Sequence, residues 1–478
     1  MLFRTEDFKF IAFLKYFIIF QPILDILTYF SIIYLHQSVT IGIIIRVLFM
    51  GLCTLYIFFG GNQYSLKKYI ITYLLLLFIV LGIGLIINFM NKPVFDVFSE
   101  LQFYLKTVYY PILFCTILLL FSGDRNQNQT QQTLLSSITI AMLITAISMF
   151  VAILTGTAST TYKSVKAGYT GWYFAGNEIG AIVAICFPLL LIYSIKKTEQ
   201  LRDFIYWIPT ILLSICALWI GTKVSYLGIL ITIIVTVVVN IIVFLYSKWK
   251  NTNWKKTINK ILLFNIVTAV FYFGVFPFSP AYKNITGEYA NINEVVKENS
   301  HDSAAKAKKE AEKKRAREKQ KYNAENENDF IINSQVLNIL LSSRDNFFYP
   351  IYNDYRDASL AHKLFGLGYA GFYEGEPKLI EMDFFDIFFS HGILGFILIF
   401  MPLFIVFWKV IKTLFTHFSS FFRIENILLL FSLGLGLGVA FLAGHVLFAP
   451  AVSIYLTITM ALLFHFHTTN SDSRVKFK

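Results

Sequence analysis

Charged side chains are scarce in this chain of 478 residues, at 15 % of its composition, whereas apolar residues make up 56 %. About a quarter of the residues are charged in a typical soluble domain, so this composition excludes an ordinary soluble protein. Cysteine is rare as well. The four cysteines lie in apolar runs at no metal-ligand spacing, so we expect small packing residues rather than disulfides or a zinc site. They are Cys53, Cys115, Cys186 and Cys216.

Long apolar runs dominate the sequence instead. Each is about twenty residues long, enough to cross a hydrocarbon core of about 30 Å. Lys15 and Asp25 interrupt the first run, which is also too long for a cleaved signal peptide, so we keep it as a span. We therefore predict an all-α integral membrane protein with about twelve spans. They lie near residues 11–34, 40–60, 69–90, 105–122, 134–155, 173–195, 204–221, 225–246, 259–279, 384–408, 427–446 and 449–467.

The basic residues indicate how these spans are oriented. With the N-terminus inside, most Lys and Arg residues outside the longest loop fall in cytoplasmic connectors, whereas Lys92, Lys163, Lys166 and Lys223 lie in short outer ones. This asymmetry predicts that both termini are cytoplasmic and that the longest loop is outside. The net charge of +12 then reflects topology, and we expect no nucleic-acid binding.

A long polar segment divides the chain into three parts. Residues 1–279 contain the first nine predicted spans, residues 280–382 form the large outer loop, and residues 383–478 hold the last three spans and a cytoplasmic tail. Within the loop, 303–321 is a basic, low-complexity run without an apolar stripe, so we expect a solvated helix or disorder. It could attract an anionic glycan or lipid headgroups, but we favour a tolerated insertion.

The second half of the loop is expected to be structured. Residues 330–344 have the apolar spacing of an amphipathic helix. After it, Arg344 and Arg356 are interleaved with aromatic residues such as Phe348 and Tyr352. Rings stack on apolar sugar faces and Arg binds phosphates through paired donors, so this mixture suits a sugar phosphate. An interfacial aromatic belt with Arg as headgroup anchor fits equally well.

Three carboxylates and a histidine follow at the start of the next span. Glu381, Asp383, Asp386 and His391 lie in IEMDFFDIFFSHGILGF. A charge at a helix centre in a bilayer costs about 2.5–3.5 kcal/mol, so such a cluster indicates a working site. The alternatives are a charge cluster favoured by the helix dipole and a site for a divalent cation. On one continuous helix His391 would lie about 12 Å beyond Asp383, where we expect a packing hydrogen bond.

Other spans also carry polar residues. Arg46 could snorkel outward or line a phosphate pocket, and Lys106 is expected to snorkel. Asn177 and its neighbour Glu178 are expected to face the bundle interior, because lipid exposure would be costly. We expect Asp25 and three histidines to stabilise helix packing or to mark the inner rim. These histidines are His445, His465 and His467.

Several motifs together resemble the bacterial O-antigen ligase/polymerase superfamily, with its Wzy-type polymerases and WaaL-type ligases. TGWYFAGNEIGAIVAICFPLLL (170–191) looks like the family's G-x-x-x-N-x-x-A…P span, and GTKVSYLGIL (221–230) like its basic helix start, with Lys223 at the basic position. SSRDNFFYP, FGLGYAGF and the acidic stretch before GILG are similar in order to its last large outer loop. The resemblance implies a GT-C-like helical bundle in a bacterial cytoplasmic membrane.

The resemblance also implies a function. Family members act outside on a glycan held by undecaprenyl pyrophosphate, without a metal or other cofactor. The partners implied are this lipid-linked oligosaccharide and the bilayer, with a flippase and a chain-length regulator as further candidates. WaaL-type ligases carry a His-Asn pair at the place where this chain has Glu381 and Met382. We therefore expect a polysaccharide polymerase, with a ligase as the alternative and a lipid-linked-glycan flippase or transporter as the less favoured one.

The chemistry of such a transfer selects site residues. A sugar hydroxyl attacks an anomeric carbon and polyprenyl pyrophosphate leaves, so cations must neutralise the leaving group and a base helps the attack. Glu381 and Asp383 are the predicted bases, and Arg344 is the first catalytic cation. The other predicted pyrophosphate ligands are Arg356, Lys223, Lys163, Lys166, Arg46 and Asn177.

Overall fold

The computed structural model describes residues 3–36, 40–60, 65–123, 127–162, 166–249, 255–287, 344–373, 375–416, 418 and 423–472. Among them are twelve helices long and apolar enough to cross a membrane, so the prediction of an all-helical protein with about twelve spans is confirmed. The spanning helices are α1 (Phe3–Leu35), α2 (Ile41–Phe59), α3 (Ser65–Asn91), α4 (Val97–Gly123), α5 (Gln127–Leu154), α6 (Gly176–Lys197), α7 (Ile208–Ile220), α8 (Lys223–Trp249), α9 (Lys255–Val275), α14 (Asp383–Thr416), α16 (Ile424–Leu442) and α17 (Pro450–Asp472).

Short elements complete the fold. The 3-10 turn η1 (Leu201–Trp207) extends α7 to spanning length, and η2 (Phe276–Phe278) follows α9. A small antiparallel hairpin forms from β1 (Ser159–Thr160) and β2 (Tyr169–Gly171). Helices α12 (Asp345–Asp357) and α13 (Leu360–Phe365) precede α14. The basic run 303–321, Lys163 and the predicted amphipathic helix up to residue 343 lie outside the described residues.

Three helices form the centre of the bundle. In α4, α6 and α17, 83 % of the most apolar stretch is buried, against 28 % in α3 and in α9, which therefore lie at the periphery. Within this centre α4 packs along α17, and α16 packs along α6 from outside it. Because the central helices meet other helices on all sides, polar groups that they carry can face the protein interior rather than lipid.

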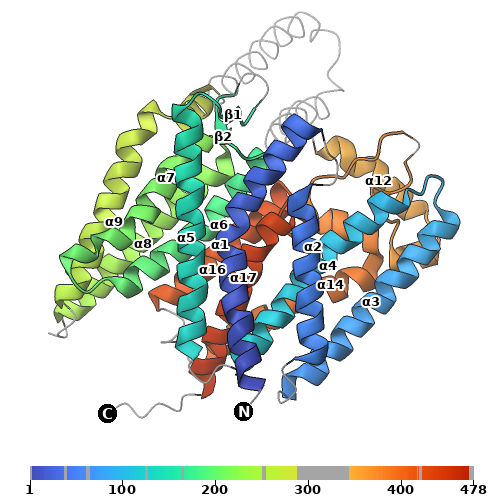
Figure 1. The fold of residues 1–478 in the computed structure, drawn as a ribbon, viewed down its shortest axis with the longest axis horizontal. Helices are drawn as coiled ribbons and strands as arrows, with labels where there is room; N and C mark the ends of the chain where they lie inside the picture. The colour runs from blue at the N-terminus through green and yellow to red at the C-terminus, as the bar shows by residue number, and fades with distance from the viewer. Residues whose placement is uncertain are drawn as a thin grey trace, which may run out of the picture.

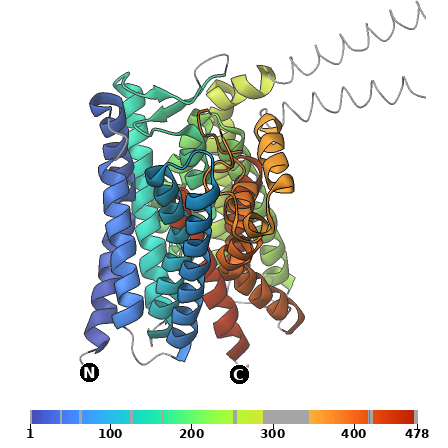
Figure 2. The same cartoon turned by 90° about the vertical axis from the view of Figure 1, so that its right-hand side faces the viewer.

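The two ends of the bundle differ. The start of α1 and the end of α17 lie at one end, whereas β1, β2 and α12 lie at the other (Figures 1 and 2). The Tyr29 hydroxyl lies 2.7 Å from the Ser159 hydroxyl and so ties the last turns of α1 to the hairpin. We name the end that carries the hairpin and α12 the loop end.

The tenth span is broken near its start. Gly392 in α14 has φ +65° and ψ −174°, which is not helical. The expectation of one continuous helix from Asp383 to His391 and beyond is therefore wrong, and two helical segments meet at Gly392. A Cβ at this position would lie 2.6 Å from the Gly366 nitrogen and from the Leu364 carbonyl oxygen. The close approach of the 364–366 backbone therefore requires a glycine, and the helix changes direction where it occurs.

Residues 366–371, which we name the strap, are fixed to the α3–α4 corner. Lys92 Nζ lies 2.6 Å from Glu100 Oε1 and also donates to the Tyr369 carbonyl, while Glu100 Oε2 accepts from the Tyr369 nitrogen at 2.8 Å. Burial lowers the pKa of Lys92, and the Glu100 carboxylate opposes this shift. Gly368 has φ +75° with the Glu100 carboxylate against it, so no side chain fits there. The ion pair thus sets the position of Tyr369.

Candidate functional site

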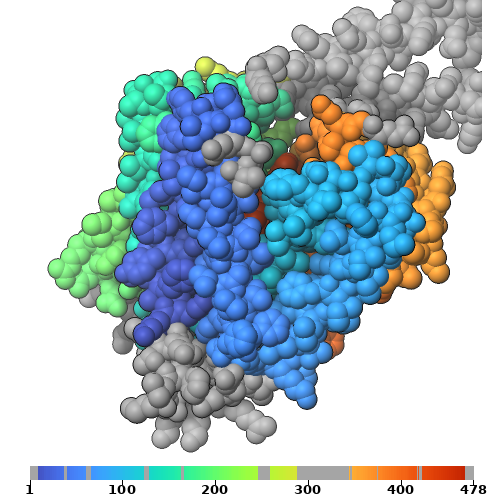
Figure 3. Space-filling view, turned by 45° about the vertical axis from the view of Figure 1, so that its right-hand side comes forward, coloured from blue at the N-terminus to red at the C-terminus, as the bar shows by residue number. Residues whose placement is uncertain are grey.

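A cavity of about 610 Å³ opens into the bundle at the loop end. Its walls come from the last third of α1, from the first turns of α2, α4, α6 and α17, and from residues 443–449 between α16 and α17. We name this connection the roof loop. Figure 3 shows a hollow between α2 and α4, with reddish side chains of the C-terminal part of the chain inside it. The polar groups of the lining are Asp25, Thr28, Arg46, Ser99, Gln102, Lys106, Tyr109, Tyr173, Glu178, Tyr369 and His445.

An ion pair forms one side of the cavity. Arg46 Nη2 lies 2.6 Å from Asp25 Oδ1, and Arg46 Nε donates to Gln21 Oε1 at 3.0 Å. Both charged groups are almost fully buried among apolar helices, where an unpaired charge would be strongly disfavoured. The pair therefore holds α1 against α2, and the guanidinium still has N–H donors beyond these two bonds. Arg46 lines the cavity and does not snorkel outward, and its role as a phosphate ligand stays a prediction.

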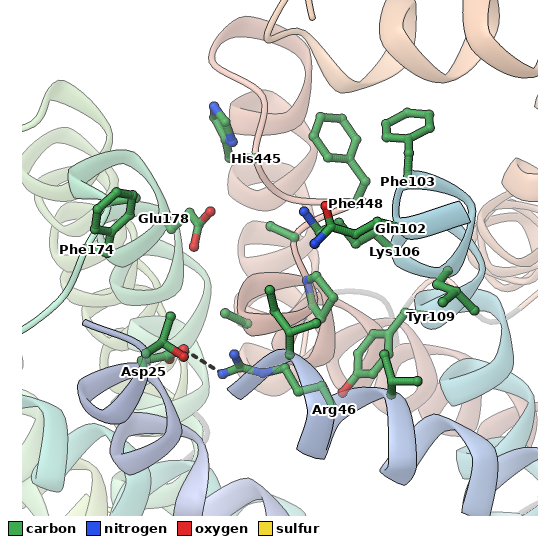
Figure 4. A pocket seen from close by; sticks show the side chains of 18 of the residues that line it. Asp25, Arg46, Gln102, Phe103, Lys106, Tyr109, Phe174, Glu178, His445 and Phe448 are labelled. Atoms are coloured by element: carbon green, nitrogen blue, oxygen red, sulfur yellow. Dashed lines mark hydrogen bonds and ion pairs between the residues drawn. The ribbon is translucent and has the colours of Figure 1, made fainter. Parts of the chain in front are cut away.

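A second pair of opposite charges lies on facing walls. Lys106 comes from α4 and Glu178 from α6, and both side chains are half-buried and point into the cavity (Figure 4). They attract each other electrostatically, yet neither makes a hydrogen bond or an ion pair with another described residue. Gln102, one turn from Lys106 on α4, points into the same space. An ammonium and a carboxylate kept apart in an apolar wall can each receive a ligand group.

The roof loop brings a histidine to the cavity. His445 has φ +60°, and the glycine before it, Gly444, has φ +67°. Both left-handed residues reverse the chain between α16 and α17, so that His445 and Phe448 line the cavity at the end away from Arg46 (Figure 4). The expectation that His445 serves helix packing or marks the inner rim missed this position in the cavity lining. The signal in the sequence is the glycine-histidine pair between two apolar runs, shortly before Pro450.

The carboxylate of Asp383 fixes the backbone of the roof loop. Its Oδ2 accepts from the Val446 nitrogen at 2.8 Å and from the Leu447 nitrogen at 2.6 Å, and the residue is fully buried. A Cβ on Gly444 would lie 2.6 Å from the Glu381 carbonyl oxygen, so the two backbones are in close contact. These contacts give Asp383 a role in positioning, and it does not line the cavity.

Arg344 is held against the same loop. Its Nε donates to the Glu381 carbonyl at 3.1 Å, and its Nη2 donates to the Ala443 carbonyl at 3.3 Å and lies 3.5 Å from Glu381 Oε2. The structure thus brings together the three predicted catalytic residues, Arg344, Glu381 and Asp383. All three pack against the backbone of the roof loop, and none of them lines the cavity. Their catalytic roles stay predictions.

The carboxylates near the start of α14 mostly bind backbone. Asp386 accepts from the Ile380 nitrogen at 2.8 Å and from the Met382 nitrogen at 3.0 Å, which fixes the turn before the helix. Asp383 and Asp386 together fit the alternative of a charge cluster at a helix start. His391 lies buried beneath them, stacked on Phe103 and 3.3 Å from the Thr107 hydroxyl, in the packing role expected for it.

The remaining predicted phosphate ligands lie elsewhere. Arg356 is exposed and pairs with its neighbour Asp357 at 2.9 Å. Lys223 is half-buried at the start of α8, and Lys166 is exposed, 5.6 Å from the centre of the Tyr162 ring. Asn177 is exposed beside Glu178. None of these four lines the cavity, and their roles as phosphate ligands stay predictions.

The fold and the cavity define a class: a multi-pass integral membrane protein with a charged cavity at one end of its helix bundle. The whole-chain comparison then gives the family. The family model described as O-antigen ligase like membrane protein matches residues 7–466, and the chain belongs to this family. Its members are membrane enzymes that transfer glycans from lipid-linked substrates. Comparisons with curated proteins and with solved structures found no match.

Proposed function

We propose that this protein polymerises a surface polysaccharide, such as a capsule, an exopolysaccharide or an O-antigen, from oligosaccharide units carried on undecaprenyl pyrophosphate. The single observation that carries the proposal is the cavity, where Arg46, Lys106 and Glu178 face one space inside an apolar bundle. A pyrophosphate joined to a sugar needs cations for its oxygens and a carboxylate near the attacking hydroxyl. The family relationship supports a lipid-linked glycan as the substrate.

The entrance to the cavity suits a lipid carrier. Ile44 and Leu48 on α2 and Leu101 on α4 are exposed residues that also line the cavity, so apolar side chains border the hollow seen in Figure 3. In a membrane these side chains face hydrocarbon. A polyprenyl chain can remain in the bilayer at this border while its pyrophosphate lies farther in, beside Lys106. A soluble sugar nucleotide would gain nothing from such an entrance.

The proposed reaction is a direct displacement. An acceptor hydroxyl oxygen forms a bond to the anomeric carbon of the donor sugar, the bond from that carbon to the phosphate oxygen breaks, and its electron pair stays on the leaving pyrophosphate. Lys106 and the spare N–H donors of Arg46 stabilise this charge. Glu178 is the carboxylate of the cavity that Arg46 does not pair, and we propose that it takes the hydroxyl proton. Glu381, at the back of the roof loop, is the second candidate.

The orientation in the membrane is part of the proposal. The basic connectors predicted to be cytoplasmic include those that hold Lys67 and Lys196, at the end of the bundle opposite the hairpin and α12. The positive-inside rule therefore supports placing the loop end, with the cavity, outside the cytoplasmic membrane and both termini in the cytoplasm. Lipid-linked units on the outer leaflet would then reach the cavity sideways.

A ligase is the second candidate function, and the description of the family supports it. Such an enzyme would use the same cavity for the donor but would transfer finished glycan to a different acceptor. The departure at Glu381 and Met382 from the His-Asn pair of WaaL-type ligases favours the polymerase.

The test is a glycan gel together with an analysis of the lipid carrier in cells that lack the protein. A polymerase predicts loss of the long-chain ladder and accumulation of single repeats on the carrier. Long chains that persist on the carrier would establish a ligase and overturn the proposal. Return of the wild-type ladder on re-expression of the gene is the control for effects on neighbouring genes.

A further inference from the structure

A second hollow of about 460 Å³ lies between α12, α14 and the last turn of α16 and has purely aromatic walls. Three of its rings come from α12, five from α14 and one from α16, among them Phe348, Phe388 and Phe441. We name this hollow the aromatic groove. Its rings support one another: Phe348 stacks on Tyr352 with ring centres 5.8 Å apart and meets Phe389 edge-on at 5.7 Å. The groove is therefore built from packed rings that each hold the next in place.

The chemistry of the groove favours hydrocarbon over sugar. The hydroxyl of Tyr355 donates to the Lys363 carbonyl at 2.8 Å and so is already used by the backbone. Sugar recognition requires hydrogen-bond partners around the hydroxyls of the ring, and the lining offers almost none. Phe441 is 47 % exposed and Tyr352 is 42 % exposed, so the groove is open on its outer side. Its rings lie on α12, on the first four turns of α14 and on the last turn of α16.

One loop connects the groove to the cavity. Phe441 lines the groove, and His445 and Phe448 of the roof loop line the cavity. Between them the Ala443 carbonyl accepts from Arg344, the N-cap residue of α12, and α12 forms one wall of the groove. A chain lying in the groove would therefore carry its polar end to Arg344 and the roof loop. The groove and the cavity therefore both lead, along apolar side chains, to the roof loop.

We propose that the aromatic groove binds the polyisoprenoid tail of a second lipid-linked glycan, the acceptor. This inference rests on the proposed polymerase function, because polymerisation joins two lipid-linked molecules and the lateral entrance between α2 and α4 is assigned to the donor. The flat faces of rings suit the methyl branches and double bonds of an isoprenoid chain. The acceptor approaches on the α12–α14 side, the donor approaches between α2 and α4, and their sugars meet at the roof loop.

The test uses the full-length protein in liposomes and measures the KM of acceptor analogues. The acceptor is a lipid-linked repeat with a phosphonate at its anomeric position, which can accept a glycan but cannot donate one, made with either an undecaprenyl tail or a short prenyl tail. We expect wild type to prefer the long tail. Phe388→Ala should raise the KM of the long-tailed acceptor about tenfold and leave that of the short-tailed one unchanged, since it removes apolar contact only.

Phe415→Ala is the matched control. Phe415 lies near the other end of α14, is exposed and does not line the groove, so its removal should change neither KM. If wild type and Phe388→Ala prefer the long tail equally and make a normal ladder, the groove does not bind the acceptor tail. The proposed polymerase function would then still stand. A photo-crosslinking amino acid at position 388 gives an independent readout: labelling by the lipid-linked acceptor supports the inference, and labelling by phospholipid alone overturns it. Absence of any ladder from wild type would instead refute the proposed function.

Discussion

Arg46 and Asp25 join two neighbouring helices across the side of the cavity, with Arg46 Nη2 2.6 Å from Asp25 Oδ1. Gln21, one turn before Asp25 on α1, completes the contact by accepting from Arg46 Nε. A guanidinium at this depth is stable only with a partner, so α1 supplies the carboxylate that lets α2 present a cation to the cavity. The pair is at once a structural link and part of the charged lining.

Asp25→Ala should destabilise the protein more than the double variant Asp25→Ala with Arg46→Met. Removing one partner of a buried pair leaves an unpaired charge and typically lowers the free energy of unfolding by about 3–5 kcal/mol. Replacing both partners by apolar residues restores much of that stability. Thermal unfolding in detergent measures the difference. Equal melting temperatures for the single and double variants would show that Arg46 finds another partner or water.

Arg344→Ala should abolish polymer while leaving membrane insertion intact. The change removes the N–H donors that bind the Glu381 and Ala443 carbonyls. The roof loop, which carries His445, then loses one of the contacts that fix its backbone. Arg202→Ala is the matched control, because Arg202 is exposed in η1 and does not line the cavity. The readouts are the glycan ladder and the amount of protein in the membrane fraction. A normal ladder from Arg344→Ala would remove this residue from the site.

Three carboxylate variants compare the candidate bases. Glu178→Gln should reduce the rate of transfer by about 10²–10⁴-fold, the usual contribution of a general base, without loss of stability. Glu381→Gln should have a smaller effect, because Glu381 lies behind the roof loop. Asp383→Asn should lower the melting temperature, since its carboxylate accepts from two backbone nitrogens. An active Glu178→Gln beside an inactive but stable Glu381→Gln would place the base at Glu381.

Glu100→Gln should loosen the strap. The amide that replaces Oε2 cannot accept from the Tyr369 nitrogen if its oxygen keeps the contact with Lys92, so one of the two contacts is lost. We expect faster hydrogen exchange in residues 366–373 and a higher KM for the lipid-linked donor, because Tyr369 lines the cavity. Glu199→Gln, at an exposed position on a connector at the other end of the bundle, is the control. Unchanged exchange in the strap would contradict this role for Glu100.

The spans could be predicted from the sequence because a bilayer imposes one strong rule, a run of about twenty apolar residues. The break at Gly392 could not, since the glycine lies inside such a run and is required only by the backbone of residues 364–366, packed against it. The cavity was equally hidden. Asp25, Arg46, Lys106 and Glu178 lie on four helices, and only the packing of α1, α2, α4 and α6 brings them together.

The acidic stretch was the most conspicuous feature of the sequence, and its chemistry is the part least visible from the sequence. Carboxylates near a helix start serve equally as bases and as acceptors of backbone N–H groups. Asp383 and Asp386 make the second kind of contact. The position of His445 depended on two left-handed residues in the roof loop, which the helical pattern on either side does not reveal.

The most direct test of the central claim is polymerisation by the purified protein in liposomes that contain lipid-linked repeat units, with Lys106→Met and Lys68→Met measured beside wild type. Lys68 is an exposed cation near the start of α3 that does not line the cavity. Wild type and Lys68→Met are predicted to make a ladder at the same rate, and Lys106→Met to be slower by about 10²-fold or more. A ladder formed by Lys106→Met at the wild-type rate would contradict the assignment of this cavity.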